Sequence, residues 1–328
     1  MQQPPDDVDD DAVLSAVVAG WDVPAVAASY LPVGFGSHHW TVTSASGTRW
    51  FATADTLGSA DGLADLEAAL SVPDAAQRAG APGAHAPLRS VTGSAVVALG
   101  DGYALSVQPW LEGLSGRFGD RWADADAAAL TAVVAGLHGI PVSTTRARPE
   151  DATMAGAGGL VRLLDAVATG RRPEVAGAGP LVAGVLDLVA HHAGAVREAM
   201  ATVDERLPGD GHVVLTHGEP HPGNVVVTDG GPVLVDWETA RVAEPERDLW
   251  LLAARTGLDV AGLYAERTGR RPDPARMRRR AVRWALADVV SFVPTLLGAA
   301  VETADTAWQL EALTETLEAL ESTLGTGR

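Results

Sequence analysis

The segment that most constrains the fold is residues 213–238, which interrupts a long helical region. It contains three short runs rich in Val and Leu, separated first by a polar loop and then by a Gly-Gly turn. This pattern predicts strand, loop, strand, turn and strand in succession. Glu219 and Asn224 then lie on the loop, and Asp236 ends the last strand. We expect these three oxygen-bearing side chains to converge.

The chemistry of these side chains suits a hard metal ion. Mg²⁺ prefers carboxylate and amide oxygens, and it usually takes only one or two from protein when phosphates and water supply the others. Asn224 and Asp236 are therefore candidate ligands, and the preceding Glu219 carboxylate can accept a proton from an attacking hydroxyl. His217 and His221 have the spacing of a helical zinc site, but the Gly and Pro residues around them oppose a helix.

Composition restricts the class of protein. The chain has 328 residues, 47% hydrophobic and 20% charged, which is typical of a globular protein with about two domains. The 24 basic and 42 acidic residues give a net charge of −18, which opposes binding to nucleic acid or anionic membranes and favours cationic ligands. There is no cysteine and no lysine, so all basic residues are Arg. Disulfides, thiol catalysis, Schiff-base lysines and a Walker A lysine are excluded.

The N-terminal sequence gives no targeting signal. Residues 1–11 are rich in Asp, Pro and Gln and are predicted to form a disordered acidic tail. We find neither a secretory signal nor about 18 consecutive apolar residues without charge, so we expect a cytoplasmic protein with no membrane partner.

The chain changes character near residue 108. Residues 12–107 contain short apolar runs broken by Gly, Ser and Thr, which predict a small antiparallel sheet with hairpins and one or two helices. Beyond this point, long Ala/Leu/Val-rich stretches predict helices at 125–138, 181–200 and 276–297. A leucine stripe between residues 310 and 324 indicates either a core-facing helix or a coiled-coil seam. The fold class is therefore α+β.

Two motifs carry a resemblance to a known family. The sequence His-Gly-Glu-Pro-His-Pro-Gly-Asn at 217–224, followed by Val-Asp-Trp-Glu at 235–238, resembles the catalytic and metal-binding motifs of the aminoglycoside phosphotransferase family, within the protein-kinase-like superfamily. The run Glu-Pro-Glu-Arg-Asp-Leu at 244–249, and the later helix with Asp288, are similar to the spectinomycin-type branch.

The resemblance implies a protein-kinase-like fold of two lobes. A small antiparallel-sheet N-lobe that covers the nucleotide spans residues 12–107, and a hinge spans 108–113. A larger, mainly helical C-lobe spans 114–328 and holds the catalytic loop and the acceptor site.

The resemblance also assigns roles to the loop residues. Glu219 falls where the family has its catalytic Asp, Asn224 at the Mg²⁺-binding Asn, and Asp236 at the metal-binding Asp. Glu219 is one methylene longer than Asp and must retract to reach the same hydroxyl. His217 is implied to hydrogen-bond the loop backbone, and we expect Asp248 to anchor the helix that begins near it.

The nucleotide site implied by the resemblance lies in the N-terminal part. Its phosphate-covering loop and hinge would comprise Gly34, Phe35, Gly36, Ser37, Gln108 and Trp110. At the position of the family's phosphate-pairing lysine this chain has Thr53, and Glu67 is the candidate for the usual lysine partner. The phosphate charge would then be neutralised by Mg²⁺, by the loop's backbone N–H groups or by an arginine such as Arg49. Alternatively, no group replaces the lysine.

Together, the motifs and the resemblance imply a Mg²⁺-dependent O-phosphotransferase. It would move the γ-phosphate of ATP or GTP to a hydroxyl of a cationic aminoglycoside or aminocyclitol antibiotic, as a resistance kinase does. Glu238, Glu244 and Asp288 are candidates to pair with ammonium groups of the acceptor, although each alone more often has a structural role.

Two alternatives stay open. The missing lysine and the Glu at 219 suit a non-catalytic pseudokinase that binds a ligand or partner, whereas intact Asn224 and Asp236 oppose it. A kinase for a metabolite such as choline or a sugar would share the mechanism. The sequence indicates neither the oligomeric state nor a choice between ATP and GTP.

Overall fold

The chain forms two compact units. The computed structural model describes residues 3–34, 36–59, 61–151, 153–171, 179–204, 211–299 and 301–325. The first unit comprises Met1–Glu150 and Gly211–Pro272, and the second comprises Asp151–Asp210 and Asp273–Arg328. The chain therefore passes between the units three times.

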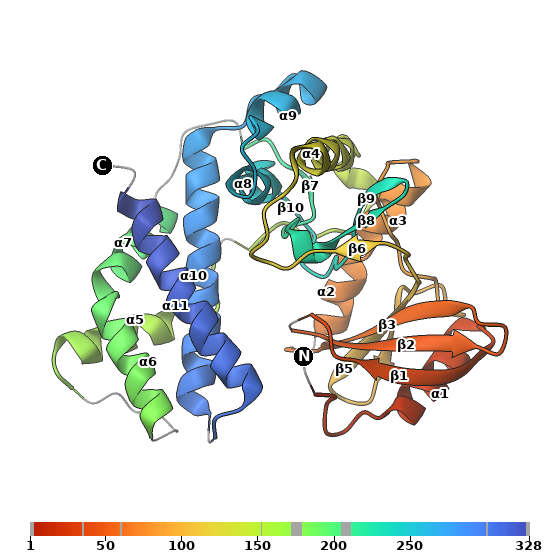
Figure 1. Cartoon of the computed structure of the whole chain (residues 1–328), viewed down its shortest axis with the longest axis horizontal. Helices are drawn as coiled ribbons and strands as arrows, with labels where there is room; N and C mark the ends of the chain where they lie inside the picture. The colour runs from red at the N-terminus through yellow and green to blue at the C-terminus, as the bar shows by residue number, and fades with distance from the viewer. Residues whose placement is uncertain are drawn as a thin grey trace. The chain divides into compact units, whose positions relative to one another are not determined.

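An antiparallel five-stranded sheet opens the first unit (Figure 1), with strand order β1-β2-β3-β5-β4. Its strands are β1 (Ala25–Leu31), β2 (His38–Ser44), β3 (Arg49–Thr56), β4 (Val96–Leu99) and β5 (Tyr103–Pro109). Side chains alternate between the two faces of a strand, and in β3 Trp50, Ala52 and Ala54 belong to a hydrophobic core. The intervening residues of β3 lie on the opposite face.

Helix α1 (Asp10–Trp21) covers the core face of this sheet, where Val13 and Val17 are fully buried. The Asp9 side chain caps the helix by accepting a hydrogen bond from the Ala12 N–H at 2.8 Å. The Asp10 carboxylate accepts a hydrogen bond from the Trp40 indole at 2.9 Å. The helix thus begins within residues 1–11, for which the sequence predicted a disordered tail, because these carboxylates have partners in the fold.

The rest of the first unit contains residues 213–238, the segment predicted to form strand, loop, strand, turn and strand, and the elements around it. Its elements are α2 (Gly62–Ala69), α3 (Ser71–Arg78), β6 (Leu114–Ser115), α4 (Asp124–His138), the 3-10 helix η1 (Val142–Thr144), β7 (Val214–Thr216), the 3-10 helix η2 (Pro222–Asn224), β8 (Val225–Thr228), β9 (Gly231–Leu234), β10 (Arg241–Ala243), α8 (Glu246–Ala254) and α9 (Val260–Thr268). The predicted strands correspond to β7, β8 and β9, but β7 pairs with β10, which the sequence analysis missed. Strands β6, β8 and β9 form a separate sheet. The β7–β10 pair therefore brackets the loop and the β8–β9 hairpin.

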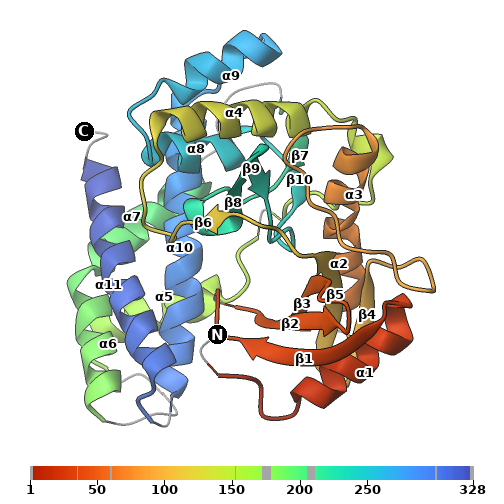
Figure 2. The same ribbon diagram turned by 45° about the vertical axis from the view of Figure 1, so that its right-hand side comes forward.

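The described part of the second unit is helical. Its helices are α5 (Ala157–Ala168), α6 (Pro180–His191), α7 (Ala193–Asp204), α10 (Pro274–Gly298) and α11 (Ala304–Gly325). Figure 2 shows α10 and α11 running alongside each other. Residues Leu313, Leu317, Leu320 and Leu324 of the leucine stripe are buried in the core, which favours the core-facing interpretation.

The single helix predicted over 181–200 is two helices. The break lies at His192, whose Nδ1 is 2.9 Å from the Glu321 carboxylate on α11. Helix α10 is long and apolar enough to cross a membrane by length and composition alone, a test that buried core helices also meet. Val289, Val293 and Leu296 of this helix are buried in the second unit's core.

The antiparallel sheet of the first unit and the helices of the second confirm the predicted α+β class.

Candidate active site

The predicted catalytic loop lies between β7 and β8 and is held mainly through its backbone. The Asn224 side-chain amide donates a hydrogen bond to the Glu219 carbonyl at 3.2 Å. The Val235 N–H donates to the Asn224 carbonyl at 3.0 Å, which ties the loop to the residue before Asp236. Since the amide nitrogen of Asn224 is engaged, the amide oxygen is the end of this side chain that can bind a cation.

His217 joins the loop to Val235, the residue that follows β9. Its Nε2 donates to the Val235 carbonyl at 2.8 Å, and its Nδ1 accepts from the Glu219 N–H at 3.3 Å. The ring is fully buried and meets the Trp237 ring edge-on, with centroids 4.6 Å apart. Burial lowers the pKa of His217, so the ring is neutral and can both donate and accept.

Asp248, on α8, anchors the same loop from the other side. Its fully buried carboxylate accepts hydrogen bonds from the His217 N–H at 2.9 Å and the Gly218 N–H at 2.6 Å. It also accepts from His138 Nε2 at 3.0 Å, and the other nitrogen of His138 meets the Tyr264 hydroxyl at 2.9 Å. Burial alone would raise the pKa of Asp248, but the His138 hydrogen bond and neighbouring charges lower it, so the carboxylate stays ionised.

The backbone at Gly218 has a φ of 106°, which disfavours any side chain. A Cβ at this position would collide with the guanidinium of Arg247. That guanidinium donates to the Thr216 hydroxyl at 2.9 Å and the Thr239 carbonyl at 2.8 Å, and it pairs with Glu150 at 3.3 Å. Arg247 thus fills the space beneath the loop, and only glycine leaves room for it.

Asp236 belongs to a group of four carboxyl side chains whose charges interact, together with Glu238, Asp55 and Glu219. Asp236 has a positive φ of 67°, which is unusual for a residue other than glycine. Burial raises the pKa of Glu238 well above its usual value, and the charges of Asp236, Asp55 and Glu219 add to the effect. One carboxylate oxygen of Glu238 is buried without a hydrogen-bond partner among the described residues. Burial likewise raises the pKa of Asp55 to about 6, with Asp236 contributing. This concentration of negative potential suits a bound cation.

The predicted phosphate-covering loop connects β1 and β2. Gly34 and Gly36 have positive φ values of 69° and 95°, which glycine adopts without steric cost, while Phe35 lies outside the described residues. The Ser37 hydroxyl donates to the Asp55 carboxylate on β3 at 2.6 Å. This bond fastens the end of the loop to the sheet.

The predicted hinge, residues 108–113, begins within the last two residues of β5 and continues beyond the strand. Gln108 is buried in β5 opposite Phe51, and Trp110 meets the Phe51 ring with centroids 6.2 Å apart. The Arg49 guanidinium lies 4.4 Å from the centroid of the Trp110 ring and forms an ion pair with Glu112. Trp110 and Phe51 together offer an aromatic surface beside the hinge backbone.

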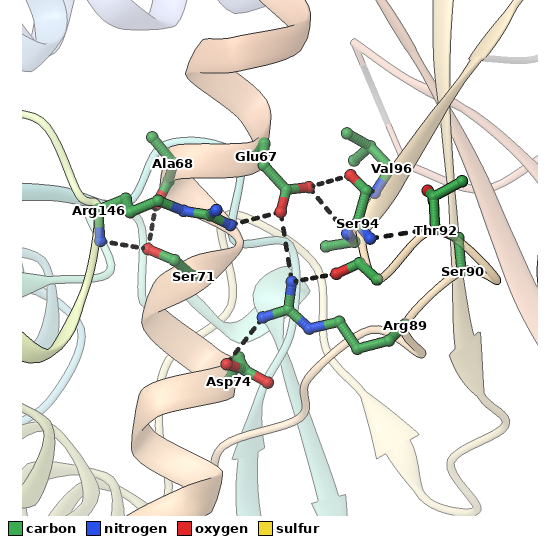
Figure 3. Close-up of polar contacts among 12 residues, drawn as sticks. Glu67, Ala68, Ser71, Asp74, Arg89, Ser90, Thr92, Ser94, Val96 and Arg146 are labelled. Atoms are coloured by element: carbon green, nitrogen blue, oxygen red, sulfur yellow. Dashed lines mark hydrogen bonds and ion pairs between the residues drawn. The ribbon is translucent and has the colours of Figure 1, made fainter.

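Glu67, the candidate partner of the family's lysine, is bound by arginines instead (Figure 3). Its carboxylate pairs with Arg89 at 3.3 Å and with Arg146 at 2.5 Å. It also accepts from the Ser94 hydroxyl at 2.6 Å and the Ala95 N–H at 2.8 Å. The carboxylate therefore links α2 to the segments before β4 and after η1.

The three residues proposed to contact an acceptor belong to different parts of the chain. Glu238 lies beside Asp236, and the Glu244 carbonyl accepts from the Arg247 N–H at 3.0 Å near the start of α8. Asp288 lies on α10 of the second unit.

Sequence reasoning missed two side chains of the site, Asp55 and His39. Both face away from the sheet's core, and the alternation of buried residues in β3 is the signal that identifies this face for Asp55. His39 is identified only once the pairing register of β2 and β3 is known, because that register places it opposite Thr53.

The sheet, the bracketed loop and the anchoring helix define a protein-kinase-like phosphotransferase. A family model described as "Phosphotransferase enzyme family" matches residues 28–282, and the chain belongs to this family. The predicted enzyme class, a phosphotransferase with a hydroxyl acceptor, is thereby confirmed. No curated protein matches the sequence.

Solved structures share the fold at low identity. A spectinomycin phosphotransferase in complex with ADP and spectinomycin is 15% identical with a TM-score of 0.74, covering 97% of this chain and 99% of that chain. A macrolide 2'-phosphotransferase from Brachybacterium faecium is 22% identical with a TM-score of 0.55, covering 94% of this chain and 98% of its own. An aminoglycoside phosphotransferase from Alicyclobacillus acidocaldarius is 18% identical with a TM-score of 0.54, covering 99% and 97%.

Proposed function

We propose that the protein transfers the γ-phosphate of ATP or GTP, in a Mg²⁺-dependent reaction, to a hydroxyl of a small cationic aminocyclitol or aminoglycoside. The observation that carries the proposal is the catalytic loop. Glu219 and Asn224 are held on one loop whose backbone is bonded to Asp248 and, through His217, to the strand end that presents Asp236.

The donor atoms suit Mg²⁺. Asn224 offers an amide oxygen and Asp236 a carboxylate, which are ligands of the type that Mg²⁺ prefers. Among the described residues, no group of three or more His, Asp or Glu side chains is arranged to hold a metal ion. Phosphate and water oxygens would therefore complete the coordination. When bound, the ion would neutralise charge on the phosphates.

The protein's own contribution is positioning and proton transfer. The acceptor hydroxyl oxygen attacks the γ-phosphorus, the bond from that phosphorus to the β-phosphate oxygen breaks, and the hydroxyl proton passes to the Glu219 carboxylate. The backbone of Glu219 is fixed by His217 and Asn224, so the side chain starts from a defined point. The hinge backbone at Gln108 and Trp110 would receive the base, and the 34–37 loop would cover the phosphates.

The acidic character of the site supports a cationic acceptor. Glu238 adds a buried carboxyl group beside Asp236, and the whole chain carries a net charge of −18. We assign Glu238 and Glu244 to ammonium recognition. Because ATP and GTP are cytoplasmic, the reaction would occur there.

Transfer assays with Asp236→Asn test the proposal. Asparagine tolerates a left-handed backbone, so the fold should be kept while the metal-binding charge is lost. With Mg²⁺, radiolabelled ATP or GTP and a panel of spectinomycin, aminoglycosides, choline and sugars, we expect transfer to fall by at least about 100-fold. Asp229→Asn, on the exposed β8–β9 turn, is the matched control and should be fully active.

The outcomes separate the alternatives. Undiminished turnover in Asp236→Asn would refute the assignment of the site. Nucleotide binding without transfer to any acceptor would favour a pseudokinase, and transfer only to choline or a sugar would favour a metabolite kinase.

A further inference from the structure

One face of the five-stranded sheet presents a row of rings that leads away from the hinge. Trp110 meets Phe51, and Phe51 in turn lies against the imidazole of His39, with centroids 4.9 Å apart and planes inclined by 33°. His39 is on β2, directly opposite Thr53 of β3 in the antiparallel register. Its Nδ1 lies 3.2 Å from the Thr53 hydroxyl oxygen. The imidazole is thus the next group along the row after the aromatic surface beside the hinge.

The other ring nitrogen of His39 lies under the glycine loop. A Cβ built on Gly34 would be 3.0 Å from His39 Nε2, so the loop backbone approaches this nitrogen closely. The charge of Asp236, the candidate metal ligand, also acts on the imidazole. Nε2 therefore lies against the loop predicted to cover phosphates, and the ring is within range of the charge of the carboxylate predicted to bind their counterion.

In its neutral form His39 can present Nε2 as a hydrogen-bond donor. Burial lowers the pKa of His39 to about 4, although the Asp236 charge opposes the shift, so the ring is neutral at neutral pH. A neutral imidazole has one donor and one acceptor nitrogen. When the Thr53 hydroxyl donates to Nδ1, the proton of the ring resides on Nε2 and points away from Thr53.

We propose that His39 binds a phosphate group of the nucleotide through Nε2–H, in a chain that contains no lysine to do so. Thr53 is the positioning residue: its hydroxyl, by donating to Nδ1, leaves the ring proton on Nε2. The Asp55 and Asp236 carboxylates, which interact with each other in this region, do not bind phosphate directly because they share its charge. An uncharged donor adds binding without disturbing the nearby cation site. The inference rests on the proposed nucleotide-dependent function.

Calorimetry on the full chain tests the proposal through the phosphate dependence of binding. His39→Leu replaces the ring with an apolar group, and Mg·ATP or Mg·GTP affinity should fall about 10- to 100-fold, as expected for a lost hydrogen bond to a charged group. Adenosine or guanosine, which lack phosphate, should bind as tightly as to wild type. His39→Gln, which retains an N–H donor, should recover part of the loss.

His38→Gln is the matched control. His38 is the adjacent residue on β2, and its ring meets Tyr30, Trp40 and Tyr103 instead. Its substitution should leave nucleotide affinity unchanged.

The results distinguish the two proposals. Wild type that binds Mg·ATP or Mg·GTP, with His39→Leu binding it equally well, would overturn the role of His39 and leave the proposed function standing. Wild type that binds neither nucleotide would overturn both. If His39→Leu does not fold, ¹⁵N NMR of the wild-type imidazole replaces it. We then expect the His39 Nε2 signal to shift with Mg·ADP and not with adenosine, and an unchanged signal would refute the proposal.

Discussion

Replacing Asp55 with asparagine should stabilise the protein at neutral and alkaline pH. The carboxyl group lies on β3 facing other carboxylates, and burial with the charge of Asp236 raises its pKa from 3.8 to about 6. The folded state thus binds the Asp55 proton more tightly than the unfolded state does. Stability from this group is complete at low pH and is lost as the pH rises through the folded pKa of about 6. A shift of about two units corresponds to a penalty of about 3 kcal/mol above that pH, as an upper limit.

Asparagine removes the charge and keeps an oxygen that can accept the 2.6 Å hydrogen bond from Ser37. Urea unfolding followed by tryptophan fluorescence should therefore give Asp55→Asn a higher free energy of unfolding by about 1 to 3 kcal/mol at pH 8. At pH 5 the difference should shrink to about half, because folded Asp55 is then largely protonated. Burial lowers the pKa of His39 and of His221 to about 4, so both residues reduce stability in acid. This effect is the same in the wild type and in Asp55→Asn, and it cancels in the difference between their free energies of unfolding.

Asp101→Asn, in the exposed β4–β5 turn, is the control and should change stability little at either pH. The reasoning would be refuted if Asp55→Asn gave no stabilisation at pH 8, or if its advantage grew as the pH fell.

Two further substitutions test the supports of the site. Gly218→Ala should lower stability by about 2 to 4 kcal/mol and turnover by at least about 100-fold, since it strains the backbone and displaces Arg247 from beneath the loop. Thermal unfolding and kinetics would measure both, and unchanged turnover would contradict the tight packing described. Glu67→Gln should cost about 1 kcal/mol and increase hydrogen exchange in α2, because two partly exposed arginines lose their counter-charge. Asp65→Asn, which breaks a more exposed pair with Arg148, should cost less, and an equal or larger loss would contradict the role given to Glu67.

Helices and strands with a regular spacing of apolar residues were predictable from the local sequence. The helix expected at 125–138 is α4 (Asp124–His138), and the sheet contains antiparallel hairpins, as its apolar runs broken by Gly, Ser and Thr predicted. The helix expected over 181–200 is interrupted at His192, whose side chain contacts Glu321, more than a hundred residues away. No local pattern contains such a contact.

Some residues of the candidate site were predictable from the local sequence, and others were not. Glu219, Asn224 and Asp236 were identifiable because they lie within one short segment. The contributions of Asp55 and His39 depend on the register of strands and on the approach of that sheet face to the Asp236 segment. Sequence spacing alone does not encode either.

The division of each unit into two stretches of chain has a consequence for biosynthesis. Ribosomal synthesis completes the first unit's residues at Pro272, before α10 and α11 exist. Until those helices emerge, Leu164, Val185 and Val196 on the earlier helices lack the apolar surface that buries them in the finished core. A chain stalled near residue 272 would therefore expose three uncovered amphipathic helices, and it is the species most prone to aggregate or to require a chaperone.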